Sequence, residues 1–229
     1  MTPTWKRALF GINAVFATFG VGLSFILTVL GTYPSNNTNP TSLGYAGQGM
    51  IGRVLDFFTY FTIWSNILVA IVMAMLFVRP DRDSFWFRAV RLSALLMIVV
   101  TGIIYNAILA ASAQLQGLEV VSNLFEHILT PIVSLLVWLV AGPRGWFSWR
   151  IILASLIIPI VWLVFALIRG AFIGAYPYGF VDVATYGYAT VLTNVAGIVV
   201  FALVLCMIFW GIDWLIRRVT SGERATASA

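Results

Sequence analysis

The sequence is short of charge and holds a single histidine and a single cysteine. Only 9% of its 229 residues are charged and 61% are hydrophobic, whereas a soluble domain carries roughly 25% charged residues. The chain therefore lacks the polar surface that a water-soluble globule needs. The lone Cys206 excludes an intramolecular disulfide and a cysteine-based metal site. The lone His127 excludes a bis-histidine haem site and a histidine-rich metal centre, so we expect no metal and no cofactor.

The sequence also lacks the motifs of several common functions. Its net charge is +5, but the basic residues lie between apolar segments rather than on one basic face, so we expect no nucleic-acid partner. A Ser-His-Asp triad on a nucleophile elbow would need Gly-x-Ser-x-Gly, which is absent. A glycine-rich phosphate loop is absent as well. What the chain does have is long apolar runs.

Six apolar segments reach or approach the length of about 20 residues that a helix needs to cross a bilayer. The predicted spans cover residues 8–30, 57–78, 92–113, 120–141, 151–168 and 183–212. One domain, residues 1–219, holds all of them, and we expect the small polar stretch 220–229 to be a disordered tail. The fifth span is the shortest, and Pro159 predicts a kink in it. The fold class is therefore all-α, a polytopic membrane protein with six transmembrane helices.

The distribution of basic residues predicts the orientation of these spans. An even number of spans places both termini on one side of the membrane. Of the 13 lysines and arginines, only Arg53 and Arg169 flank the opposite side. Because cytoplasmic loops carry an excess of lysine and arginine, the N and C termini are predicted to be cytoplasmic.

Polar residues enter the second span in its outer half. Thr59, Thr62 and Asn66 fall on one helix face by their i, i+3, i+7 spacing, and Ser65 lies alongside them. Counted from residue 57, Thr62 is about 8 Å along the helix. We therefore expect a hydroxyl-bearing face at this depth.

The third and fourth spans bring polar residues to the same level. His127 is about 10 Å along the fourth span, and Asn123, Glu126 and Thr130 share its face. Asn106 lies about 10 Å from the outer end of the third span. Since lipid penalises unsatisfied polar groups, these side chains should face inward and form a polar pocket that opens outward.

Pro131 adds a detail to this layer. A proline has no N–H to donate to the carbonyl four residues earlier, so the carbonyl of His127 loses its helical partner. We expect the helix to bend there.

Each of these polar residues also has a structural interpretation. Threonine and serine in spans usually bond to their own helix, and Asn66, Asn106 and Asn194 are ordinary contacts between helices. His127 could be satisfied by a glutamate or an asparagine, and Arg169 and Asp182 are expected to form a structural ion pair. Against this, an ionisable residue inside a span is a functional candidate, and activating a hydroxyl needs only one base within reach.

Three short motifs resemble a known family. They are FTYFTIWSN at residues 58–66, NLFEH at 123–127 followed by TP at 130–131, and YP at 176–177. At these residues the chain resembles the androgen-induced-gene family of integral membrane hydrolases, and more closely its bacterial six-helix relatives. The resemblance implies a location in the bacterial plasma membrane. It also implies a threonine nucleophile and a histidine that together cleave fatty-acid esters of hydroxy fatty acids.

The resemblance places the histidine on His127 and the threonine on Thr62 or, with a three-residue shift, on Thr59. We therefore predict an intramembrane lipid-ester hydrolase with Thr62 as nucleophile and His127 as base, acting on a fatty-acyl ester in the bilayer. The candidates for orienting or binding the substrate are Asn66, Asn106, Asn123, Ser65, Glu126 and Thr59. The alternatives are a non-enzymatic protein that binds or transports a lipid or small molecule, and a structural subunit.

Overall fold

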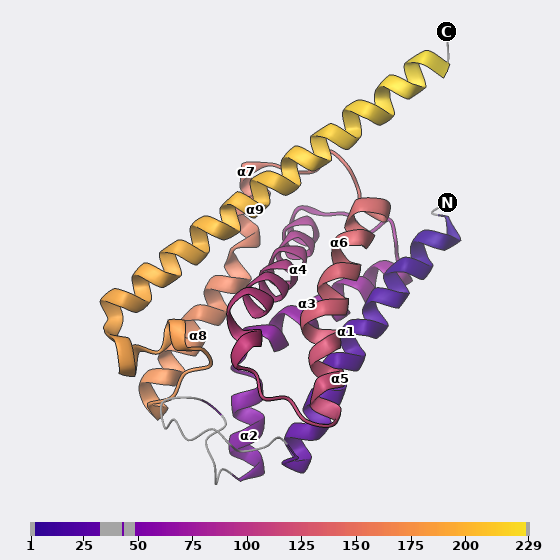
Figure 1. The fold of residues 1–229 in the computed structure, drawn as a ribbon. Helices are drawn as coiled ribbons and strands as arrows, with labels where there is room; N and C mark the ends of the chain where they lie inside the picture. The colour runs from indigo at the N-terminus through magenta and orange to yellow at the C-terminus, as the bar shows by residue number, and fades with distance from the viewer. Residues whose placement is uncertain (1–2, 33–42, 44–48, 228–229) are drawn as a thin grey trace.

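The computed structural model describes residues 3–32, 43 and 49–227, and its regular elements in these ranges are all helices. Six helical segments are long and apolar enough to cross a membrane, which confirms the predicted all-α, six-span class. These segments are Thr4–Leu30, Phe61–Val78, Phe85–Ser112, Leu118–Ala141, Trp149–Ile173 and Val183–Thr220. Both termini lie toward the same end of the bundle, which we call the terminal end (Figure 1). The opposite end, where α2 (Met50–Phe57) lies, is called the far end.

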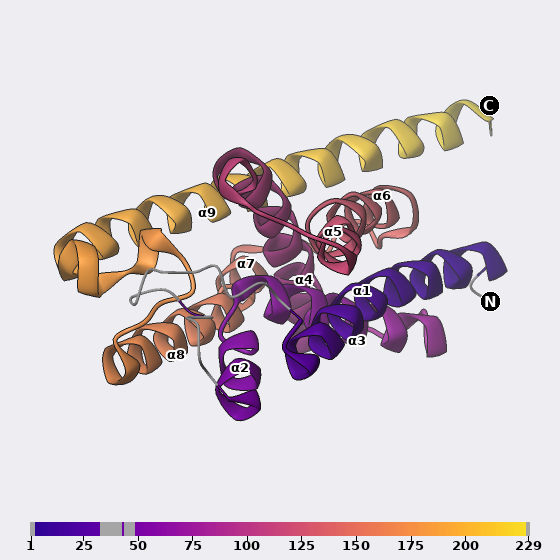
Figure 2. The ribbon, with the colours of Figure 1, turned by 60° about the horizontal axis from the view of Figure 1, so that its bottom comes forward.

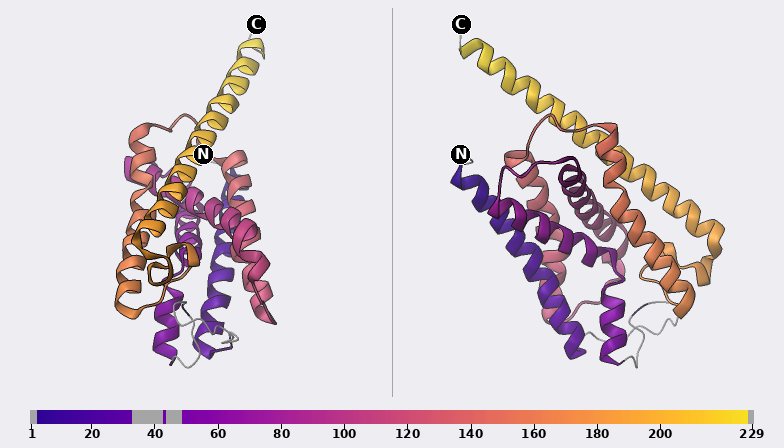
Figure 3. Two further views of the ribbon diagram at one scale, coloured as in Figure 1. Left: turned by 60° about the vertical axis from the view of Figure 1, so that its left-hand side comes forward. Right: turned by 180° about the vertical axis from the view of Figure 1, so that it is seen from behind.

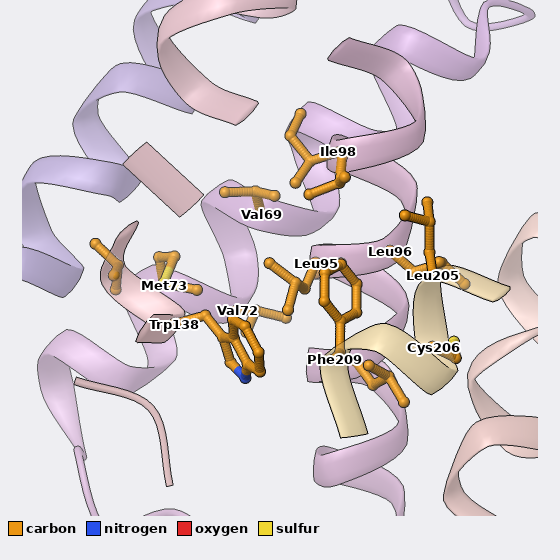
Figure 4. Packing of buried hydrophobic residues seen from close by; sticks show 14 of the residues in the cluster. Val69, Val72, Met73, Leu95, Leu96, Ile98, Trp138, Leu205, Cys206 and Phe209 are labelled. Carbon is orange, nitrogen blue, oxygen red and sulfur yellow. The ribbon is translucent and has the colours of Figure 1, made fainter. Parts of the chain in front are cut away.

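Four helices form the packed body of the protein. They are α1 (Thr4–Leu30), α3 (Phe61–Val78), α4 (Phe85–Ile104) and α6 (Thr130–Ala141). Their apolar faces meet in a core where Val69 and Val72 of α3 lie near Leu95 of α4 and Trp138 of α6 (Figure 4). Cys206 is fully buried in this core.

The last two spans form one flank of the molecule. Figures 2 and 3 show α8 (Ile157–Ile173) and α9 (Val183–Ala227) on the side away from α1. Helix α7 (Trp149–Ser155) joins α8 through an interruption at Leu156. Pro159 cannot donate to the carbonyl of Ser155, so the kink predicted in this span has its physical cause here.

Three of the predicted spans are interrupted near the far end. The second does not begin at residue 57: α2 stops there, Phe58–Tyr60 form a turn, and α3 begins at Phe61. The third ends in a π turn, η1 (Tyr105–Leu109), followed by a 3-10 turn, η2 (Ala110–Ser112). The fourth consists of α5 (Leu118–Leu124), a π turn, η3 (Phe125–Leu129), and α6. Single π turns inside α-helices are frequent at functional sites.

Two other expectations differ from the structure. Arg169 donates to Asp56 on α2 at 2.5 Å rather than pairing with Asp182, because α8 runs on past Arg169 to Ile173 and carries its side chain beside α2. Asp182 instead caps the start of α9 by accepting from the main chain and hydroxyl of Thr185. Helix α9 continues to Ala227, where a disordered tail was expected, and residues 228–229 lie outside the described part.

Candidate functional site

The site is built around the first turn of α3. Because the chain turns at Phe58–Tyr60, Thr62 is the second residue of a new helix rather than one in mid-helix. Because it lies in the first turn of the helix, its N–H has no acceptor within α3, and it donates instead to Tyr178 Oη at 3.3 Å. Its hydroxyl oxygen lies 3.1 Å from His127 Nε2 and 3.4 Å from Tyr178 Oη.

His127 is held by the π turn η3 and by an aromatic neighbour. The ring of Tyr105, from the facing π turn η1, stacks on the imidazole with 3.7 Å between centroids and 24° between planes. Nδ1 of His127 is buried and forms no hydrogen bond within the described residues, although the main-chain carbonyl of Asn123 lies beside it. A proton on Nδ1, directed toward that carbonyl, leaves the Nε2 lone pair free to accept the proton of Thr62.

The main-chain carbonyl of His127 receives no hydrogen bond from residue 131, because Pro131 has no N–H. It lacks a helical partner and accepts instead from Asn106 Nδ2 at 3.1 Å, while the same amide donates to Gly102 at 2.8 Å. The contact is close because Gly102 has no side chain: a Cβ there would lie 2.8 Å from Cβ of Pro131. Asn106 therefore joins the π turn η1 of the third span to the π turn η3 of the fourth span.

Asn66 links the segments that carry Thr62 and His127 in a similar way. Its amide donates to the carbonyl of Thr62 at 2.9 Å and to the carbonyl of Glu126, which precedes His127, at 3.2 Å. Asn66 is fully buried. It fixes the start of α3 against η3, and with both amide hydrogens engaged it is an orienting residue rather than a donor to a ligand.

The other predicted residues lie outside the pocket. Thr59 is in the turn before α3, not on a shared helical face, and its hydroxyl donates to Leu55. Ser65 bonds to the carbonyl of Thr62 and to the hydroxyl of Thr101. Glu126 is buried against α1, where a Cβ on Gly20 would meet its Cγ at 3.0 Å. Asn123 lies between the Tyr105 hydroxyl and His127.

Two residues of the site were missed in the sequence. Tyr178 and Tyr105 read there as ordinary aromatic residues near the ends of spans. The YP pair at residues 176–177 marks the segment that carries Tyr178, but nothing in it indicates contact with residue 62. Burial raises the pKa of the Tyr178 hydroxyl, so this group remains a protonated donor at neutral pH.

A cavity of about 60 Å³ adjoins Thr62. Polar groups enter it from Thr62, Thr101, Tyr105 and Tyr178, and the rest of its wall is apolar. One water needs about 10–15 Å³ of such space, so both a water and part of an apolar ligand fit beside Thr62. In the described residues no three His, Cys, Asp or Glu side chains come together in a way that could hold a metal ion.

Comparison with protein-family models, with curated proteins and with solved structures finds no match for this chain.

Proposed function

We propose that this protein is an intramembrane lipid-ester hydrolase in which Thr62 is the nucleophile and His127 the general base. The observation that carries the proposal is the 3.1 Å contact between Thr62 Oγ1 and His127 Nε2 beside a largely apolar cavity. A nucleophile and a base within hydrogen-bond reach, with the base oriented by further groups, are the general signature of covalent catalysis.

The reaction would proceed in two halves. Nε2 of His127 takes the proton of Thr62 as Oγ1 attacks the ester carbonyl, and the tetrahedral intermediate collapses by expelling the alcohol, which receives that proton. An acyl-threonine remains. A water then gives one proton to Nε2 and attacks the acyl carbonyl, so that the fatty acid leaves and the proton returns to Thr62.

The start of α3 and the hydroxyl of Tyr178 are the groups that would stabilise the oxyanion. The N–H of Thr62 lies at a helix N-terminus, where the helix dipole favours negative charge. The hydroxyl of Tyr178 accepts from that N–H and has its own proton to donate. One such donor is typically worth about 3 kcal/mol of transition-state stabilisation. Asn66 and Asn106 would act by positioning Thr62 and His127.

The substrate class follows from the surroundings and from the family resemblance. The apolar cavity suits a fatty-acyl ester taken from the bilayer, such as a fatty-acid ester of a hydroxy fatty acid. With both termini cytoplasmic, the site would lie in the outer half of a bacterial plasma membrane, and water would reach it from the outer face.

A fluorophosphonate probe tests the assignment, because it labels activated hydroxyls covalently. In the detergent-solubilised protein we expect labelling of the wild type and of Thr62→Ser, and loss of labelling in Thr62→Ala and His127→Ala. Thr59→Ala is the matched control, since Thr59 is buried three residues earlier with its hydroxyl bonded to Leu55. Equal labelling of all variants would refute the proposal. Lipid binding without Thr62-dependent labelling would identify a lipid-binding protein instead.

A further inference from the structure

A second cavity, of about 90 Å³, lies beside the first and is lined by α4, α8, α9 and their neighbours. The two cavities share the walls formed by Phe61, Val100, Trp162, Phe180 and Ile198. We call the second cavity the apolar chamber, because all the residues that line it are apolar. The chamber thus adjoins the pocket that contains the Thr62 hydroxyl.

The chamber extends from the shared wall toward the terminal end of the bundle. On α9 its lining runs from Val195 to Ala202, and on the α7–α8 side from Leu163 to Leu156. Six residues of helix correspond to about 9 Å, so the chamber continues along the spans toward the terminal end. A chain attached to a carbonyl at Thr62 would run along the helices toward the middle of the bilayer.

The chamber also reaches the surface between the last two spans. Ile160 of α8 and Val199 of α9 both line it, and they are 49% and 37% exposed. In a bilayer this surface faces the acyl chains of lipids. An ester could therefore enter sideways between α8 and α9 without leaving the hydrocarbon.

We propose that the apolar chamber holds the acyl chain of the substrate and sets the chain length that the protein accepts. This inference rests on the proposed hydrolase function. Because no charged group lines the chamber, the chain in it is a plain hydrocarbon chain. The alcohol part lies on the opposite side of Thr62, in the pocket next to Tyr105, Leu109 and Tyr178. Moving a chain from lipid to the chamber changes little in hydrophobic burial, so shape and length decide the fit.

The test narrows the chamber at Ala202, the last residue of α9 that lines it. Ala202 is 8% exposed and lines the chamber, whereas Val204, two residues away on the same helix, is 50% exposed and does not line it. We expect Ala202→Phe to lower kcat/KM for p-nitrophenyl palmitate by about tenfold or more, and to leave p-nitrophenyl butyrate within about twofold. Val204→Phe should leave both esters unchanged.

A variant that enlarges the chamber should shift the preference toward longer chains. This test does not require the protein to tolerate a larger side chain at residue 202. Leu156→Ala should raise kcat/KM for p-nitrophenyl esters with acyl chains longer than palmitate, relative to kcat/KM for p-nitrophenyl palmitate. Unchanged chain-length profiles in both variants, with Thr62-dependent hydrolysis intact in the wild type, would overturn the chamber assignment alone. Should Ala202→Phe fail to elute as a folded protein, the profile of Leu156→Ala decides. Wild-type protein without Thr62-dependent hydrolysis would overturn this inference and the proposed function together.

Discussion

Two of the polar pairs that join helices in this bundle differ in what surrounds them. Toward the terminal end, Asn13 and Ser134 bond to each other in both directions, at 3.1 and 3.2 Å, and both side chains are almost wholly buried. Toward the far end, Thr62 and His127 also form a hydrogen bond between helices. By residue type alone, both pairs are polar contacts that hold helices together.

The difference lies in the space and in the chemistry of the partner. The cavity next to Ser134 measures about 10 Å³, room for about one water, while that next to Thr62 measures about 60 Å³. An asparagine cannot take a proton from a serine, whereas a neutral imidazole is a base. A polar pair in a span therefore becomes a candidate for catalysis only where a base, a nucleophile and space for a substrate meet.

The largest expected effect separates the two pairs directly. Thr62→Ala should lower ester turnover by about 10³-fold or more, because it removes the nucleophile. Ser134→Ala should leave turnover within about twofold and instead reduce stability by about 1 kcal/mol, since Asn13 loses its partner. Turnover and thermal unfolding in the same detergent check both. Equal losses of turnover in the two variants would show that the pairs do not differ in function.

A smaller effect is expected from the hydroxyl that the sequence did not reveal. Tyr178→Phe should reduce kcat by about 10²-fold through the loss of a donor to the oxyanion, with KM and melting temperature little changed. Tyr186→Phe is the control, because Tyr186 is 56% exposed near the same end of the bundle. A Tyr178→Phe enzyme with wild-type kcat would remove Tyr178 from the mechanism.

The smallest expected effect concerns the contact that positions His127. Gly102→Ala places a Cβ 2.8 Å from Cβ of Pro131 and forces α4 and α6 apart next to the two π turns. The free energy of unfolding should therefore fall by about 1–3 kcal/mol. Turnover should fall less than in Tyr178→Phe. Gly22→Ala, where a Cβ meets nothing within 4 Å, should change neither property. If both glycine variants melt like the wild type, the close packing at Pro131 does not constrain the site.

The predictable part of the molecule is the part that a regular helix describes. Apolar length gave all six spans, helical spacing placed Thr62 and His127 at one depth, and the missing N–H of Pro131 explained a free carbonyl. Asn106, which binds that carbonyl, was identified as a polar residue at this level but not as its partner. Pairing across helices depends on their rotation and packing, which local sequence does not specify.

The departures from regular helix were not predictable, and they decide the site. The turn at Phe58–Tyr60 separates Thr59 from Thr62, and it leaves the Thr62 N–H without a helical acceptor, so that this group donates to Tyr178 Oη. The π turn η3 changes the direction in which His127 points. Tyr178 arrives from a connection more than a hundred residues along the chain. The helical periodicity of apolar residues does not indicate where a helix is interrupted or which distant residue packs against it.

Trp162 connects the proposed acyl-chain chamber to the proposed nucleophile. Its ring is part of the wall between the pocket and the chamber, and its indole N–H donates to the carbonyl of Thr59 at 2.9 Å. In the proposed mechanism, the residue that would contact the acyl chain thus also holds the turn that precedes the proposed nucleophile, Thr62. A substitution of Trp162 should therefore disturb both the chamber and the position of Thr62, and a redesign of the proposed chain-length preference should begin on α9.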